Sequence, residues 1–262
     1  MLRKAIDSYM NATATLDTKL YLIDNSPEDD ARLLANHSRI EYIYNNRNIG
    51  FGAGHNMALK KSIIEGSSYH LVLNPDVYFD INAINTLFNF MEANANVGLC
   101  MPKVLYPDGR LQPLCKLLPS PRVLILRRFL FFLHKLLARQ NYYYELQFTG
   151  YNKLMDVPFL SGCFMFLRTD VLKEVGLFDE RIFLYTEDVD LSRRIHKFHR
   201  TVFYPDVTIY HYHQRGSYKS TTLLMHNIRS AIKYFNKWGW LFDKERDLMN
   251  RNALVRIHNE NR

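Results

Sequence analysis

Three short apolar segments separated by helical patterns constrain this chain more than any other feature. Strands are predicted at 19–24 (KLYLID), 40–44 (IEYIY) and 69–73 (YHLVL). Helices are predicted at 51–65 and 81–95, where apolar residues recur with helical spacing. Strands that alternate with helices of this length are typical of βαβ units. The sequence therefore predicts an α/β domain built on a mostly parallel sheet flanked by helices.

The second half of the chain is less regular. Five prolines between Pro102 and Pro121 indicate a loop with short strands. Strands are predicted at 159–167 and 202–210, and a helix opened by acids is predicted at 187–198. A further helix is predicted at 220–237, followed by a charged tail.

The domain division follows from this pattern. Residues 1–215 are predicted to form the α/β domain, and residues 216–262 a C-terminal helical extension with its tail. The first 17 residues lack the apolar core of a secretory leader. Three cysteines without close spacing predict neither a disulfide framework nor a cysteine-based zinc site, so a reducing cytoplasm is expected.

The charge balance predicts an anionic partner. Lys and Arg number 34 against 26 Asp and Glu, which gives a net charge of +8 with histidine neutral. Nucleic acid, anionic lipid and a phosphorylated substrate are each compatible with such a balance. Because no RNA-binding or DNA-binding module is visible, nucleic acid is not expected as a partner.

Two acidic turns follow predicted strands. Asp24 begins the turn after 19–24, and Asn74, Pro75 and Asp76 follow 69–73. In an open parallel sheet, ligands bind outside the carboxyl ends of the strands. A carboxylate there can accept a hydrogen bond from a ribose or base, or hold a divalent metal. Ordinary turn chemistry is the alternative for each turn taken alone.

A third acidic group, Glu187, Asp188 and Asp190, opens the helix predicted at 187–198. Acids at a helix start interact favourably with the helix dipole, which is the simpler explanation. Three carboxylates in four residues exceed what capping needs. Crowded carboxylates repel each other, and one of them can act as a general base.

A glycine-rich stretch, NIGFGAGHN at 48–56, precedes a predicted helix. Such a stretch can bind phosphate at a helix N-terminus. However, His55 stands where a dinucleotide-binding motif has its third glycine, and the Gly-Lys-Ser/Thr ending of a P-loop is absent. The motif alone is a weak signal.

Taken together, these segments resemble the family 2 glycosyltransferases, and most closely the bacterial rhamnosyltransferases of surface-polysaccharide synthesis. The resemblance covers roughly residues 2–238 and rests on five segments in the family's order: DNS, NIGFGAGHN, LNPDV, FLSGCFMFLRTDVLKEVGLFDERIFLYTEDVDLSRRI and YPDVTIYHYHQRGS. It implies a GT-A fold, a nucleotide-diphosphate sugar donor, a divalent metal (Mg²⁺ or Mn²⁺) and inversion at the anomeric carbon.

The resemblance also implies roles for single residues. Asp188 is implied as the general base with Glu187 beside it, and Asp76 and His211 as metal ligands. Only the last position of the Asn-Pro-Asp turn is acidic, where the family has an acidic DxD-type motif. Donor-side and sugar-pocket contacts are implied for Asp24, Asn48, Gly50, Phe51, Gly54, Asn56, Asn74, Ser161 and Gly162.

The function that the resemblance implies is transfer of L-rhamnose from dTDP-rhamnose to a lipid-linked saccharide, in O-antigen or capsule synthesis. The family also has an apolar strand that would precede Leu2, and this chain begins within the helix after it. A different nucleotide sugar and a truncated, non-catalytic remnant are therefore the alternatives.

Residues 122–139 combine apolar and basic side chains. Arg127, Arg128, His134, Lys135 and Arg139 interrupt the run too often for a membrane span. On a single helix they would share one face, opposite Leu, Ile and Phe. We expect either an interfacial helix on an anionic membrane, at the cytoplasmic face, or a surface helix docked on the core.

Overall fold

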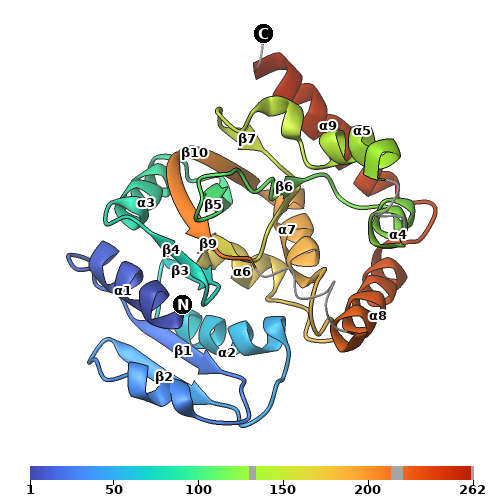
Figure 1. The fold of residues 1–262 in the computed structure, drawn as a ribbon. Helices are drawn as coiled ribbons and strands as arrows, with labels where there is room; N and C mark the ends of the chain where they lie inside the picture. Colours follow the sequence, from blue (N-terminus) through green and yellow to red (C-terminus); the bar gives the residue numbers. More distant parts are fainter. Residues whose placement is uncertain (130–133, 214–220, 261–262) are drawn as a thin grey trace.

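The computed structural model describes residues 1–129, 134–213 and 221–260 (Figure 1). The helices of this part of the chain are α1 (Leu2–Ala12), α2 (Phe51–Ile64), α3 (Ala83–Ala93), α4 (Pro121–Phe129), α5 (His134–Tyr144), α6 (Thr169–Val175), α7 (Glu187–Phe198), α8 (Thr221–Trp238) and α9 (Lys244–Glu260). Its strands are β1 (Leu20–Asp24), β2 (Ile40–Tyr44), β3 (Tyr69–Leu73), β4 (Val77–Phe79), β5 (Val97–Leu105), β6 (Cys115–Lys116), β7 (Met155–Asp156), β8 (Phe159–Leu160), β9 (Phe164–Arg168) and β10 (Arg200–His211).

The strands form one large sheet and two small ones. The large sheet has the order β3-β9-β5-β10-β4, with β7 paired to β10, while β1 pairs with β2 and β6 with β8. The α/β class is confirmed. The prediction of a mostly parallel sheet is wrong for the large sheet, because only β5 and β10 pair in parallel there. The main reason is β9, which is reached from β5 by a long connection that includes α4 and α5 and which enters antiparallel between β3 and β5.

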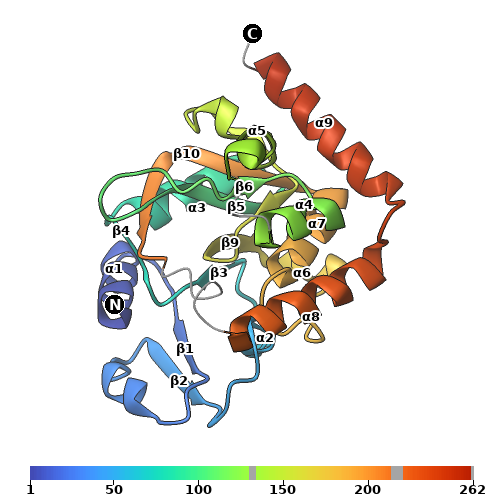
Figure 2. The ribbon, with the colours of Figure 1, turned by 45° about the vertical axis from the view of Figure 1, so that its right-hand side comes forward.

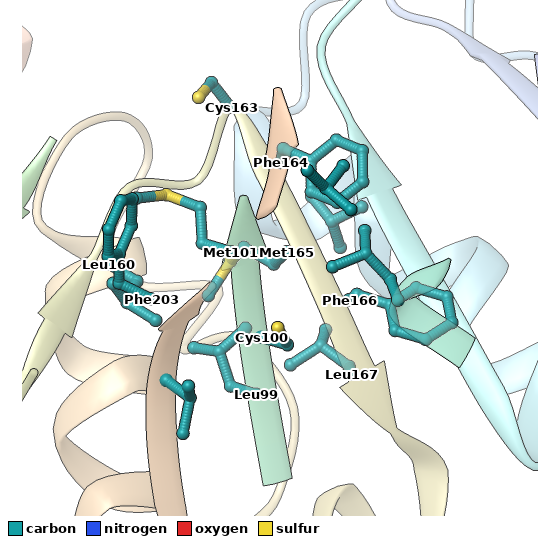
Figure 3. Close-up of a cluster of buried hydrophobic side chains, with 14 of the residues drawn as sticks. Leu99, Cys100, Met101, Leu160, Cys163, Phe164, Met165, Phe166, Leu167 and Phe203 are labelled. Carbon is teal, nitrogen blue, oxygen red and sulfur yellow. The ribbon is translucent and has the colours of Figure 1, made fainter. Parts of the chain in front are cut away.

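The hydrophobic core lies on the large sheet. Figure 3 shows Leu99 from β5, Phe203 from β10 and the run from Phe164 to Leu167 on β9 packed together. All of these side chains are buried, including successive residues of β9 that point to opposite faces. The large sheet is therefore covered on both faces, as a central sheet of an α/β protein must be.

The β1–β2 sheet is much less covered. Residues 20–23 and all of β2 are only half-buried although they are largely apolar. A cavity of about 880 Å³ separates β1 from β3, and both strands line it together with residues of α1 and α2. Leu20, Leu22 and Leu71 therefore face open space where a sheet interior would hold side chains.

The backbone of both strands also faces this cavity. Leu20 N donates to Arg39 O, and Asn45 N donates to Asp24 O, so residues 20, 22 and 24 of β1 pair with β2. Because backbone groups alternate between the two edges of a strand, those of Tyr21 and Ile23 point toward β3. On β3, the pairs formed with β9 leave residues 69, 71 and 73 pointing toward β1. The cavity thus has the open edge of a strand on each side.

The C-terminal helices pack against α7 through buried charges. Arg193 on α7 is 1% exposed and forms two hydrogen bonds to Asp243, of 2.6 and 2.7 Å. Trp238 Nε1 and Lys237 Nζ reach the fully buried Asp190 at 2.8 and 2.7 Å. The predicted boundary at 215/216 lies outside the described residues, so the two-part division stays a prediction.

Two sequence predictions need correction. The strand predicted at 159–167 is two strands, β8 and β9, separated by a turn at Ser161–Cys163. The charged tail predicted after Trp240 contains the helix α9. Within the segment predicted as a helix over 122–139, α4 extends to Phe129 and α5 begins at His134, and 130–133 lie outside the described residues. Arg127, expected on an exposed basic face, is 25% exposed and pairs with Glu145.

Candidate active site

The glycine-rich stretch forms the N-terminus of α2. Gly50 has φ = +96°, and a Cβ there would lie 2.7 Å from the carbonyl oxygen of Phe183. Only glycine fits this position. Asn48 Oδ1 accepts from Gly50 N at 3.0 Å, and Phe51 N donates to Phe183 O at 2.9 Å. The first turn of α2 is thereby fixed against the loop that leads into α7.

Asp24 ends β1 beside this turn. Its carboxylate accepts hydrogen bonds from Ser26 N at 2.9 Å and from Tyr42 Oη at 2.6 Å. Burial opposes ionisation, but the hydrogen bonds from Ser26 and Tyr42 hold the pKa of Asp24 below its usual value. Asp24, Phe51, Gly54 and Asn74 all line the 880 Å³ cavity. The structure thus brings together four of the residues predicted on the donor side.

Asn56 is placed differently. It is 2% exposed, and its amide donates to Phe178 O and Glu180 Oε1, both at 2.9 Å. Its oxygen accepts from Phe178 N at 3.0 Å. The amide therefore fixes the loop before α7, and the donor-side role of Asn56 stays a prediction.

Asp76 and His211 meet across the β4–β10 pair. His211 Nε2 lies 3.3 Å from Asp76 Oδ1, and His211 Nδ1 lies 3.0 Å from Gln112 Oε1. Burial lowers the pKa of His211, but its contacts with Asp76 and Cys163 outweigh this and raise it to about 10. Burial also raises the pKa of Asp76, but the hydrogen bond and the charge interaction with His211 outweigh this and lower it.

The Asp76–His211 pair fits a divalent metal as a partial ligand set. It offers a carboxylate oxygen and an imidazole nitrogen, and Gln112 fixes the orientation of the ring from its other nitrogen. Among the described residues no cluster of three or more metal-binding side chains occurs. A metal held by one or two protein ligands and by substrate phosphates is a common arrangement.

Asp188 is held at the N-terminus of α7 by backbone groups. Gly162 N donates to Asp188 Oδ2 at 2.9 Å, and Val189 N donates to Oδ1 at 2.9 Å. A Cβ at Gly162 would lie 3.2 Å from Asp188 Cβ and 3.3 Å from the ring of Phe51. Gly162 therefore brings Asp188 and the glycine-rich turn together. Burial raises the pKa of Asp188 despite these hydrogen bonds, as suits a base.

Glu187 is the least satisfied polar group of the site. It is 4% exposed, and its Oε2 has no hydrogen-bond partner within the described part of the chain. Burial, reinforced by Asp188, raises the pKa of Glu187 well above its usual value. The two residues before it, Tyr185 and Thr186, have φ of 68° and 54°, which is a strained region for such side chains. Buried unpaired groups and backbone strain cluster at functional sites.

Ser161 and Cys163 complete the centre of the site. Cys163 O accepts from Asn74 N at 3.0 Å, and Cys163 N lies 3.4 Å from Ser161 Oγ. The turn at Ser161–Cys163 therefore touches the Asn74 turn on one side and, through Gly162, Asp188 on the other.

Lys116 interacts electrostatically with Asp188, which the sequence did not indicate. Its register partner in the β6–β8 pair is Phe159, three residues before Gly162. Burial lowers the pKa of Lys116, and Arg127 lowers it further, while Glu145 and Asp188 oppose the shift. Its proximity to Asp188 arises from an irregular proline-rich segment, which carries no motif.

Residues 2–230 match the profile described as "Glycosyltransferase like family 2". The chain belongs to this family. None of the helices in the described part of this family 2 chain combines the length and hydropathy that crossing a bilayer needs.

Two curated relatives are glycan-building transferases. The chain is 28% identical over 180 residues to the N-acetylglucosaminyl-diphospho-decaprenol L-rhamnosyltransferase of Mycobacterium tuberculosis, covering 65% of this chain and 56% of that protein. It is 25% identical over 174 residues to the low-salt glycan biosynthesis hexosyltransferase Agl10 of Haloferax volcanii, covering 66% of this chain and 52% of that protein. The chain thus spans about half the length of these relatives.

Solved structures confirm the GT-A fold. S. aureus TarS 1–349 matches with a TM-score of 0.56 at 15% identity, covering 97% of this chain and 66% of that one. GalNAc-T7, crystallised with UDP, GalNAc and Mn²⁺, matches with a TM-score of 0.53 at 12% identity. The match covers 76% of this chain and 39% of that one. At such identities these likenesses concern the fold.

Proposed function

We propose that this chain transfers a sugar, with inversion, from a nucleoside-diphosphate donor to a saccharide hydroxyl. The observation that carries the proposal is the position of Asp188. Its carboxylate accepts a hydrogen bond from Gly162 N at 2.9 Å, and Gly162 itself lies against the ring of Phe51. The neighbouring Glu187 is buried, and its Oε2 has no hydrogen-bond partner among the described residues. A desolvated carboxylate with a raised pKa, next to a glycine-rich helix start, is arranged for proton removal near a phosphorylated ligand.

In this mechanism Asp24 binds the nucleoside, and the N-terminus of α2 lies beside the diphosphate. Asp188 accepts the proton of the acceptor hydroxyl as that oxygen attacks the anomeric carbon from the face opposite the diphosphate. A divalent metal held by Asp76 and His211 would neutralise charge on the leaving diphosphate. No covalent sugar–enzyme bond is formed, so a single displacement inverts the configuration.

The donor we propose is dTDP-L-rhamnose, and the acceptor is a lipid-linked saccharide of O-antigen or capsule type. Support comes from the mycobacterial relative, whose name specifies rhamnosyl transfer to a decaprenol-linked diphosphosugar. The haloarchaeal relative is named a hexosyltransferase, so another nucleotide sugar is the second candidate. A lipid-linked acceptor also suits peripheral action at the cytoplasmic face of a membrane.

The open cavity between β1 and β3 favours one different reading, a non-catalytic remnant with an incomplete nucleotide side. Calorimetric titration of the intact chain with a panel of nucleotide sugars and Mn²⁺, followed by transfer assays, separates these possibilities. We expect dTDP-rhamnose to bind most tightly and to be turned over. Binding of no nucleotide sugar would contradict the proposal, and binding of another sugar would correct its donor.

A further inference from the structure

The turn that joins α8 to α9 exposes three consecutive apolar residues. Trp240, Leu241 and Phe242 are 43%, 77% and 92% exposed. In Figure 2 this turn lies at the outer right edge of the molecule, far from β1 and β2. Single exposed apolar residues are ordinary, whereas three in succession at the corner between two helices suggest an interaction surface.

The structure holds this tip in its exposed position. Trp240 packs on Phe235 with ring centroids 5.3 Å apart, and its Nε1 donates to Asn236 Oδ1 at 2.8 Å. Immediately after the tip, Asp243 is 6% exposed and paired with Arg193. Leu241 and Phe242 lie between these two fixed points, so they cannot fold back onto the core without breaking a buried ion pair.

The exposed face of α9 continues the apolar surface of the tip. Leu248 and Val255 are 55% and 53% exposed and lie two helical turns apart. Lys244 and Arg251 are also exposed. Lys244 lies four residues before Leu248, and Arg251 lies between Leu248 and Val255, so the basic residues share a helix face with the apolar ones. Asp247 also lies near this face, but it is paired with Arg246. Apolar and basic side chains therefore share one surface, which we call the α8–α9 tip surface (Trp240, Leu241, Phe242, Lys244, Leu248, Arg251 and Val255).

We propose that the α8–α9 tip surface docks on an anionic lipid bilayer. Aromatic and aliphatic tip residues suit the interfacial zone of a membrane, and lysine and arginine beside them suit anionic headgroups. A second copy of this chain fits less well, because a symmetric pairing would bring Lys244 and Arg251 against the same cations. The 122–139 segment suits this role less, since Arg127 is engaged with Glu145 within the protein.

The location of the surface gives the docking a purpose, which rests on the proposed function. Arg193, which holds Asp243 beside the tip, lies five residues after Asp188 on α7. Five helical residues span about 7.5 Å along the axis. A bilayer at the tip would therefore present a lipid-linked saccharide on the side of the molecule that carries the base.

Flotation with vesicles tests this inference on the intact chain. The vesicles contain phosphatidylcholine alone or with 30% phosphatidylglycerol, on the order of cellular anionic content. We expect binding to the anionic vesicles that weakens as salt rises. Leu241→Ser with Phe242→Ser should reduce this binding about tenfold or more, because both side chains lose their burial in lipid. Lys244→Gln with Arg251→Gln should reduce it by a smaller factor and remove the salt dependence.

The matched control changes two equally exposed apolar residues elsewhere. Leu33 and Ile64 are 84% and 83% exposed and lie on the β1–β2 side of the molecule. Leu33→Ser with Ile64→Ser should leave vesicle binding unchanged. Equal loss in both double variants, or wild-type binding by the tip variant, would overturn the inference. Self-association abolished by the tip variant, without vesicle binding, would show a dimer interface instead. Because the vesicles carry no saccharide, these results are independent of sugar transfer.

Discussion

The β1–β2 sheet and the six-stranded sheet carry the two sides of the site, and they differ sharply in packing. On β9, residues 164–167 are all buried, and Gly162 just before them holds Asp188. On β1, residues 20–23 are only half-buried and face an 880 Å³ cavity, and Asp24 at their end is held by Ser26 and Tyr42. The Asp188 side of the site is therefore well supported, whereas the Asp24 side, where we propose that the nucleotide binds, rests on a sheet with an open edge.

A site residue can therefore be held by well-defined hydrogen bonds although the sheet that carries it is poorly packed. Asp24 and the glycine-rich turn have well-defined hydrogen bonds although their sheet is incompletely covered. The expected consequence is that chemistry and donor binding respond differently to mutation and to added structure. The following predictions use that difference, from the largest effect to the smallest.

The largest effect is expected from Asp188→Asn, because Asp188 is the proposed general base. Loss of a general base lowers kcat by about 10²- to 10⁴-fold. Donor affinity should stay near that of the wild type, because the proposed nucleotide contacts come from Asp24 and the start of α2. The raised pKa of Asp188 also predicts that wild-type kcat falls as pH drops through that pKa. Steady-state kinetics against pH measure both effects.

Asp170→Asn is the matched control, because Asp170 also lies in the first turn of a helix but is exposed. It should leave kcat unchanged. A collapse of donor affinity in Asp188→Asn with kcat preserved would assign Asp188 to binding instead of catalysis.

The second prediction compares one leucine from each sheet. Leu167→Ala on β9 should lower the free energy of unfolding by about 2–5 kcal/mol, because Leu167 is fully buried. Leu22→Ala on β1 should cost less than about 1.5 kcal/mol, because Leu22 already faces the cavity. Denaturant unfolding of both variants measures the difference. Equal losses would mean that β1 is as well packed as β9.

The third prediction fills the cavity. Leu2 lines it, so an added segment of about five Val and Ile residues ahead of Met1 can enter between β1 and β3. The added strand would satisfy the open edges of both strands, and the melting temperature should rise by about 5 °C or more. The same extension with two prolines cannot complete the hydrogen bonds and should give no increase. Equal behaviour of both extensions would show that the cavity does not accept a strand.

The smallest effect is expected from Glu187→Gln. Burial raises the pKa of Glu187, so the charged form destabilises the folded state. Wild-type stability should fall as pH rises from about 4.5 through that raised pKa, and this decline should be reduced in the variant. At pH values above the raised pKa of Glu187, the variant should be more stable than the wild type by about 1–3 kcal/mol. Thermal melts across pH test this, and a destabilised variant would indicate a missed partner of Glu187.

Much of the fold could be predicted from the sequence because its signals are local. The strands at 40–44 and 69–73 and the helix at 187–198 match β2, β3 and α7 residue for residue. Their apolar runs end in turn residues or begin with acids, and both signals act within a few residues. The antiparallel entry of β9 could not be predicted, because it depends on the long connection between β5 and β9 and not on any local pattern.

The site residues also divide into those with a local sequence signal and those placed by long-range contacts. The glycine-rich turn and the acids at 187–188 were found from their residue types. Lys116 was missed, because its approach to Asp188 depends on the pairing of β6 with β8. Arg127 was expected on an exposed face but forms contacts within the protein that the sequence does not reveal. The long-range contacts of Asn56 could not be predicted from the sequence either.

Hydrogen exchange of the intact chain, with and without UDP or dTDP in the presence of Mn²⁺, tests the central claim most directly. The account predicts rapid exchange in residues 20–25 and 50–57 without nucleotide and slower exchange when it is bound. Residues 97–105 and 164–168 should be protected in both conditions. Nucleotide-dependent protection confined to the six-stranded sheet, or none at saturating nucleotide, would contradict the assignment of the β1–β2 side to donor binding.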